Sequence, residues 1–229
     1  MMFRQDPKTT PGPVTTVILD CDGVILESVS VKTDAFAELF SFAAGKKEEI
    51  IAYHLNNGGM SRYDKFRYIY SDILKQPLTE SRFEELSHNF ASLVHQNVVR
   101  SPFVVGAEEF LESYHNRLAL HVVSATPEGE LLEIFEERNL LRYFRSVHGA
   151  PEKKAVHLRN IASRSSCDPS TFIFVGDARN DYSAAKEAGI RFIARIKEDE
   201  PDRFMGLAGI EYRINNLQDL DRYIRDVTC

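Results

Sequence analysis

The fold is decided near the start of the chain, where residues 14–24 have the sequence VTTVILDCDGV. The opening run of apolar and β-branched residues is typical of a strand buried on both faces of a parallel sheet. Asp20 and Asp22 follow this strand directly, and Gly23 turns the chain away. Because open α/β sheets bind ligands at the carboxyl ends of their strands, the two acids are expected to lie in a binding site.

The two carboxylates also predict what is bound. Side chains two residues apart project in the same sense from an extended backbone, so Asp20 and Asp22 would repel each other unless a cation lay beside them. A hard divalent ion such as Mg²⁺ accepts a few carboxylates and keeps water or a substrate phosphate in its other positions. Taken alone, this stretch would also fit an ordinary acidic turn.

Composition sets the broad class of the protein. A chain of 229 residues is long enough for one large domain or for a core domain with a smaller insertion. The net charge of −6 argues against nucleic acid as a partner, and no apolar run is long enough to span a membrane. Residues 1–13 are polar and contain prolines, so a flexible tail without a signal segment is expected there.

The three cysteines, Cys21, Cys167 and Cys229, are widely spaced. They form neither a metal-ligand pattern nor a disulfide framework, which indicates a reducing, cytoplasmic location.

The spacing of apolar residues divides the chain into two parts. Residues 29–100 show helical periodicity, with stripes of aromatic side chains that are expected to form a packed core. From residue 101 onward, strand and helix patterns alternate, which predicts right-handed βαβ crossovers and a parallel sheet. The fold class is therefore α/β, with residues 14–28 and 101–229 as the core and 29–100 as an inserted all-helical cap. The later strands are expected at 118–123, 146–148, 171–175 and 190–194, and the helices at 130–141, 154–162 and 180–188.

Polar residues follow the second expected strand and open the helix after the third. Ser124 and Ala125 come directly after residues 118–123, and a hydroxyl with free backbone N–H groups could bind an anion, although serine is common at strand ends. Lys153 and Lys154 open a later helix. Such lysines are usually solvated, but beside carboxylates and a phosphate one of them would be the fixed cation of the site.

Two more acids follow the strand at 171–175. Asp177 comes directly after Gly176 at the end of this apolar run, where an acid is hard to explain as a surface residue. Asp181 lies four residues later, at the start of the expected helix. An acid in that place is commonly a helix cap, so its role is open on this pattern alone.

These motifs resemble the haloacid dehalogenase (HAD) superfamily of phosphotransferases, over nearly the whole chain. The resemblance rests on the Asp-x-Asp-Gly-Val motif at 20–24, on Ser124, on a lysine at 153 or 154, and on the Gly-Asp-x-x-x-Asp motif at 176–181. It implies a Rossmann-like parallel sheet. The insertion after the first motif is similar to the helical-cap subfamily, which includes phosphoglycolate phosphatases and β-phosphoglucomutases.

The resemblance implies a role for each acid. Asp20 would attack phosphorus and become an aspartyl phosphate, while Asp22 would protonate the leaving oxygen and then deprotonate the attacking water. Asp20, Asp177 and the backbone carbonyl of Asp22 would hold Mg²⁺. Asp181 would orient water or the lysine without binding the metal itself.

The resemblance also implies how the phosphoryl group is held. Ser124 would bind a phosphoryl oxygen, and Gly23 and Ala125 would contact the substrate beside it. The lysine would neutralise the nucleophile and the transferring phosphoryl group. We expect Lys154 rather than Lys153 in this role, because Lys154 shares one helix face with the apolar residues Leu158 and Ile161.

A glycine-rich loop, NNGGMSR at residues 56–62, separates two helical stretches of the cap. It resembles the substrate-binding Gly-x-Ser-Arg loop of the β-phosphoglucomutase branch, which implies substrate contacts from Gly59, Ser61 and Arg62. The alternative is a helix–helix turn in which Ser61 caps the next helix and Arg62 is exposed.

The chain departs from the family pattern at two positions. Cys21 stands where the family often has a bulky hydrophobic residue, and we interpret it as a small buried hydrophobe rather than a redox switch. Lys32 stands where many mutase relatives carry histidine. It would either attract an anionic substrate or be a solvated helix residue.

Three functions are therefore compatible with the sequence. The first is a Mg²⁺-dependent phosphatase acting on a small phosphorylated metabolite, such as a sugar phosphate, through an aspartyl phosphate. The second is a phosphosugar mutase, and the third a non-catalytic binding protein. No nucleic-acid or membrane partner is expected, and the oligomeric state is open. The motifs do not name the substrate, because the core recognises only the phosphoryl group.

Overall fold

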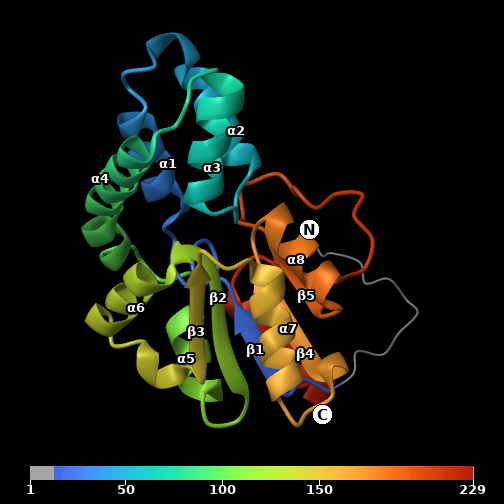
Figure 1. The fold of residues 1–229 in the computed structure, drawn as a ribbon. Helices are drawn as coiled ribbons and strands as arrows, with labels where there is room; N and C mark the ends of the chain where they lie inside the picture. The colour runs from blue at the N-terminus through green and yellow to red at the C-terminus, as the bar shows by residue number, and fades with distance from the viewer. Residues whose placement is uncertain (1–12, 229) are drawn as a thin grey trace.

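The computed structural model of the protein describes residues 13–228. The flexible tail expected at residues 1–13 lies outside the described residues, except for Pro13. Within the described range, one sheet of six parallel strands has the order β3-β2-β1-β4-β5-β6, which confirms the predicted fold class (Figure 1). The strands are β1 (Thr16–Leu19), β2 (Ala119–Pro127), β3 (Ser146–Ala150), β4 (Phe172–Gly176), β5 (Arg191–Arg195) and β6 (Ile210–Ile214).

The first strand lies in the middle of the sheet. All four residues of β1 are buried, as its apolar sequence predicts. Leu19 is level with Val122 of β2 on one side and with Val175 of β4 on the other. The residues just beyond Leu19, Val122 and Val175 therefore meet at the carboxyl end of the sheet.

Helices cover both faces of the sheet (Figure 1). The face that carries Ile18 and Phe174 packs against α7 and α8, while the face that carries Val17 and Val175 packs against α5, α6 and α9. The period of two along each strand sends neighbouring residues to opposite layers. The bounds of these helices are α5 (Ala107–Tyr114), α6 (Glu128–Glu137), α7 (Lys154–Arg164), α8 (Arg179–Ala188) and α9 (Leu217–Thr228).

Residues 29–100 are mostly helical, as their periodicity predicts, and lie beyond the carboxyl ends of the strands (Figure 1). Their aromatic stripes pack together, since the ring of Phe36 lies 4.9 Å from that of Phe90 and 5.7 Å from that of Phe66. The same apolar cluster continues into one face of the sheet. The elements are α1 (Val29–Leu39), a 3₁₀ helix (Ala44–Lys46), α2 (Lys47–Asn56), α3 (Arg62–Tyr68), a π-helical turn (Ile69–Ile73) and α4 (Glu80–Val99).

Some elements differ from the sequence patterns. The helix expected at 130–141 begins earlier, at Glu128, and ends at Glu137, because Asn139 adopts a left-handed conformation with φ of 56°. The patterns do not include α5, β6 or α9, which complete the sheet and its second helical layer. Over residues 13–228, no helix is both long and apolar enough to cross a lipid bilayer.

Candidate active site

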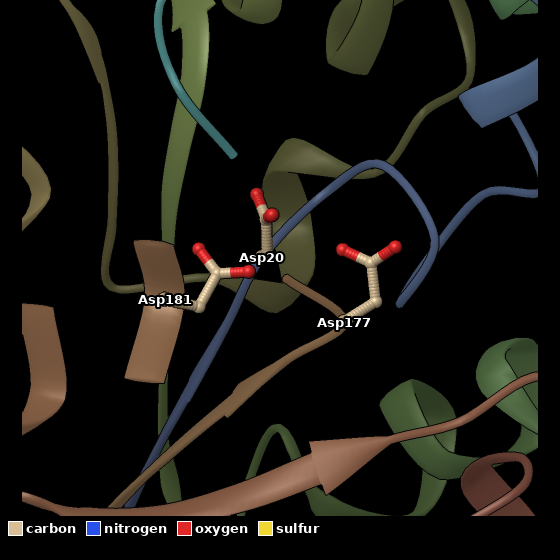
Figure 2. A group of neighbouring side chains, drawn as sticks. All are labelled: Asp20, Asp177 and Asp181. Atoms are coloured by element: carbon tan, nitrogen blue, oxygen red, sulfur yellow. The ribbon is translucent and has the colours of Figure 1, made fainter. Parts of the chain in front are cut away.

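Three aspartates converge at the carboxyl ends of β1 and β4. Asp20 directly follows β1, Asp177 follows β4, and Asp181 lies in the first turn of α8. Figure 2 shows their carboxylates pointing toward a common space, and one oxygen from each lies within 4.8 Å of the others. The parallel register of the two central strands thus brings together acids that are about 160 residues apart in the sequence.

Lys154 joins two of these carboxylates. It begins α7, and its ammonium lies 2.8 Å from Asp20 Oδ2 and 2.6 Å from Asp181 Oδ1. The side chain is buried, whereas Lys153 is exposed, in line with the helix face that the sequence favours. Burial acts to lower the pKa of Lys154, but the charges of Asp181 and Asp20 outweigh it and raise that pKa, so the lysine stays protonated.

Asp181 serves the local structure as well as the site. Its Oδ2 accepts a hydrogen bond of 3.0 Å from the backbone N–H of Ala178, which satisfies the first turn of α8, while Oδ1 holds Lys154. One carboxylate therefore caps α8 and also contacts Lys154. The side chain passes so close to Gly176 that a Cβ there would lie 2.3 Å from Asp181 Cβ, which explains the glycine.

Carboxylates outnumber cationic side chains around Asp20 and Asp177. Burial and the neighbouring Asp181 and Asp22 raise the pKa of Asp20 to about 7, even with Lys154 in contact. Burial and the same kind of repulsion hold the pKa of Asp177 well above its usual range, and the nearest ion-pair partner of Asp177 among the described residues is Arg203, at 4.0 Å. A divalent cation beside Asp20 and Asp177 would relieve this repulsion, so the donor set fits a hard metal ion.

Gly23 leaves room for Asp177. It has φ of 72°, and a Cβ at this position would lie 2.5 Å from Asp177 Oδ2. Both the left-handed backbone and the close approach require glycine. The turn after β1 is therefore shaped around the acid from β4.

Asp22 lies on the other side of the same turn and is held by three side chains. Its carboxylate forms an ion pair with Lys32 of α1 and accepts hydrogen bonds from Ser28, at 2.6 Å, and Thr126, at 3.2 Å. Burial acts to raise the pKa of Asp22, but the charge and hydrogen bond of Lys32 and the hydrogen bond of Ser28 lower it overall. Lys32 is thus a partner of Asp22 rather than a solvated residue.

Ser124 lies in β2 and is buried. Its hydroxyl oxygen accepts a hydrogen bond of 3.2 Å from the backbone N–H of Thr126, so it is already part of the turn that brings Thr126 to Asp22. Ala125 and Thr126 line the adjacent cavity.

A cavity of about 360 Å³ lies between the aspartates and the helices beyond the sheet. Asp20, Asp22 and Asp177 line it from the sheet side, and Gly59 from the loop before α3 and Arg62 from the start of α3 line it from the other side. Gly58 approaches the sheet side through its carbonyl, which accepts a hydrogen bond of 2.7 Å from Asn180. The loop that the sequence singles out therefore does reach the site.

The two polar residues of that loop behave differently. Ser61 does not line the cavity; its hydroxyl caps α3 by accepting a hydrogen bond from the backbone N–H of Asp64. Arg62 is buried rather than exposed, in ion-pair contact with Glu130 of α6 and 5.0 Å from the ring of Phe90. None of its guanidinium nitrogens has a hydrogen-bond partner among the residues that the structure describes.

The sequence does not single out three residues that line the cavity: Thr126, Lys65 and Arg203. Thr126 could have been found, because it follows Ser124 by two residues at the same strand end. Lys65 lies three residues after Arg62, which places both on one face of α3. Arg203 comes from the loop between β5 and β6, and no pattern in the sequence connects that loop to the site.

The comparison with known proteins agrees with this geometry. A family profile described as haloacid dehalogenase-like hydrolase matches residues 14–189. A phosphoglycolate phosphatase of Vibrio parahaemolyticus is 28% identical over 192 residues, which is 79% of this chain and 82% of that protein. Phosphoglycolate phosphatase 1 of Pseudomonas aeruginosa is 28% identical over 213 residues, covering 89% of this chain and 77% of the relative.

The fold has solved counterparts. The structure of a hydrolase from Pseudomonas syringae superposes with a TM-score of 0.76 at 17% identity, covering 94% of this chain and 100% of that one. The profile match includes all three aspartates of the cluster and the helices that lie between Asp20 and Asp177 in the sequence. The chain therefore belongs to the haloacid dehalogenase-like hydrolases, as its motifs predict.

Proposed function

We propose that this hydrolase is a phosphatase that removes the phosphoryl group from a small phosphorylated metabolite, with Asp20 as the nucleophile. The main support is the position of Asp20, which lies between Lys154 and Asp177 at the wall of the cavity. The phosphatase relatives and the family match support the same reaction class. The helical segment 29–100 would act as the cap that covers the reacting group.

Each side chain has a separate role in the proposed reaction. Asp20 attacks phosphorus through a carboxylate oxygen, the ester bond to the leaving oxygen breaks, and an aspartyl phosphate forms. Asp22 gives a proton to the leaving oxygen and later takes one from the water that hydrolyses the intermediate. Lys154 offsets the charge of the nucleophile, and Ser124 and the backbone N–H of Ala125 hold phosphoryl oxygens. Lys32 favours the ionised form of Asp22, which suits the second step.

Asp20, Asp177 and the backbone carbonyl of Asp22 would hold Mg²⁺. The bound ion would supply charge that offsets the repulsion between an anionic nucleophile and an anionic phosphate.

Removal of divalent metal is expected to abolish hydrolysis, and Mg²⁺ to restore it. Asp177→Asn should raise the Mg²⁺ concentration for half-maximal activity at least about tenfold, because one anionic ligand is lost. Protons compete with the metal for Asp20, whose pKa is about 7, and for Asp177, whose pKa is also raised. The Mg²⁺ requirement should therefore increase as the pH falls from about 8 to about 6.

The measurement is release of p-nitrophenol from p-nitrophenyl phosphate after treatment with chelator and titration with metal. Ca²⁺ is the matched control: its looser coordination should misplace Asp20, so it should bind without supporting turnover. Full activity in excess chelator would contradict the metal assignment.

The loop before α3 would contribute to substrate recognition through Arg62. Arg62→Ala is expected to lower kcat/KM for the best natural phosphate ester about thirtyfold, roughly 2 kcal/mol, because a buried fork-shaped cation is removed from the cavity wall. It should change kcat/KM for p-nitrophenyl phosphate much less. Arg67→Ala, an exposed arginine of the same helix, is the control and should leave both substrates unaffected. An equal loss on both substrates would assign Arg62 to cap packing.

A phosphosugar mutase remains the alternative reaction on the same intermediate. Product analysis separates the two, because a phosphatase releases inorganic phosphate and a mutase yields an isomeric sugar phosphate. The ion pair of Lys32 with Asp22 and the phosphatase relatives favour hydrolysis. The cytoplasmic location indicated by the cysteines stays a prediction; Cys21 and Cys167 are free thiols.

A further inference from the structure

Lys65 is a buried lysine in the wall of the cavity. It lies in α3, is 4% exposed, and lines the same space as Asp20. Its ammonium nitrogen lies 3.2 Å from His54 Nδ1 and 3.3 Å from the His54 carbonyl oxygen, and 5.5 Å from the centre of the Phe36 ring. Within residues 13–228, no carboxylate lies within 4.0 Å of it. The Lys65 amino group is thus held in the cap by neutral partners.

The other cations of the cavity differ from Lys65 in this respect. Each has a carboxylate in contact: Lys32 pairs with Asp22, Arg62 with Glu130, and Arg203 with Glu200. Their charges are therefore largely balanced within the protein. Among the lysines and arginines of the described cavity wall, Lys65 alone has no carboxylate in contact with it.

The charges around Lys65 support this view. Burial and the charge of Lys32 lower the pKa of Lys65 to about 7, and the distant Asp22 and Asp177 offset only part of that effect. Burial and the charge of Lys65 lower the pKa of His54 to about 3, so the imidazole is neutral and adds no further positive charge beside Lys65. A buried cation without a counter-ion costs stability, and a bound anion would remove that cost.

We propose that Lys65 binds a second anionic group of the substrate, a carboxylate or a phosphate, at the cap end of the cavity. Asp20 receives the transferred phosphoryl group at the other end. This rests on the proposed phosphatase function and names its substrate class: a phosphate ester with at least one further anionic group. Phe36 and Phe90 also line this cavity, and low polarity there strengthens the attraction between unlike charges. A cavity of about 360 Å³ is large enough for a whole metabolite of this kind.

The test compares pairs of phosphate esters that differ only in the second anionic group. For a carboxylate, the pairs are 2-phosphoglycolate with 2-hydroxyethyl phosphate, and 3-phosphoglycerate with glycerol 3-phosphate. For a phosphate, the pair is glucose 1,6-bisphosphate with glucose 1-phosphate. The Mg²⁺-loaded enzyme should prefer the member with the second anion in at least one pair, and that pair tells which anion the site accepts.

Lys65→Met should then lower kcat/KM for the preferred member about thirtyfold and change that of its neutral partner less than about threefold. Lys65→Arg should keep part of the preference, because it keeps the charge. Lys46→Met, which removes an exposed cation from the same helical segment, is the matched control and should change neither. Activity on p-nitrophenyl phosphate and the thermal midpoint show whether each variant has folded.

Equal kcat/KM for both members of every pair would overturn the proposal, and so would a preference that Lys65→Met leaves intact. These results would leave the phosphatase function standing, because phosphate would still be released. Absence of hydrolysis with every ester, including p-nitrophenyl phosphate, would instead overturn the phosphatase function and this inference with it. If Lys65→Met does not fold, loss of the preference in Lys65→Gln with p-nitrophenyl phosphate activity retained supports the proposal, and retention of the preference overturns it.

Discussion

Asp20→Asn is expected to lower turnover at least about a thousandfold, a rise in the barrier of roughly 4 kcal/mol. The amide keeps the shape of the side chain but cannot attack phosphorus and form the acyl phosphate. The variant is expected to fold without loss of stability. Burial and the neighbouring acids raise the pKa of Asp20 to about 7, so its ionised form is unfavourable in the folded protein.

The sign of the stability effect follows from this pKa. Asp20 has a higher pKa when folded than when unfolded, so its contribution to stability is lost as the pH rises from the unfolded value of 3.8 to the folded value of about 7, and the penalty is complete above that pH. In metal-free buffer, Asp20→Asn should therefore have an equal or higher thermal midpoint than the natural protein at pH values above about 7. Asp226→Asn on the exposed side of α9 is the control and should change neither turnover nor stability. A variant that retains most of its activity would rule out Asp20 as the nucleophile.

Lys154→Met is expected to have the largest effect on stability, a loss of roughly 3–5 kcal/mol. The methionine fills a similar volume, but Asp20 and Asp181 are left as buried carboxylates without the cation that lies 2.8 Å and 2.6 Å from them. For a chain of this length the thermal midpoint should fall by about 10 °C. Turnover should also fall, because the charge that offsets the nucleophile and the phosphoryl group is lost.

Two variants separate these effects. Lys153→Met alters the exposed neighbour and should change neither the thermal midpoint nor turnover. Asp181→Asn in the Lys154→Met background removes one of the unpaired charges, so it should recover part of the stability without recovering activity. If Lys153→Met reduces turnover and Lys154→Met does not, the assignment of the active-site lysine is reversed.

The order of strands and helices along the chain could be predicted because the core strands are short apolar runs that are followed by chemically distinctive residues. Residues 14–19 and 171–175 are of this kind, and the sheet joins them side by side. The sixth strand could not be recognised in this way: Ile210–Ile214 lies at the sheet edge, is only partly buried, and includes Glu211 and Arg213. Helix α9, by contrast, has a clear apolar face with Leu217, Leu220 and Ile224, so its signal was present in the sequence.

The charged groups of the core end of the site could be predicted for the same reason, since strand ends and one helix face fix their positions. Lys154 is the clearest case, because its spacing to Leu158 separated it from Lys153. The cap end could not be predicted as well. Whether Arg62 is buried depends on Glu130 and Phe90, which lie far along the chain. The spacing of Lys65 to Arg62 places both on one face of α3, but it does not by itself show that this face lines a cavity.

The central place of β1 has a consequence for biosynthesis. This strand is made first, yet its neighbours in the sheet are β2 and β4, which are synthesised about 100 and about 155 residues later. The helices between β1 and β2 can form from local contacts while β1 is still unpaired, because non-local strand pairing is slower than helix formation. The three aspartates meet only when β4 and α8 have joined β1, so the charged cluster can assemble only after the chain has been synthesised through Asp181. A fragment that ends before Asp177 lacks two of the three aspartates and therefore cannot assemble the cluster.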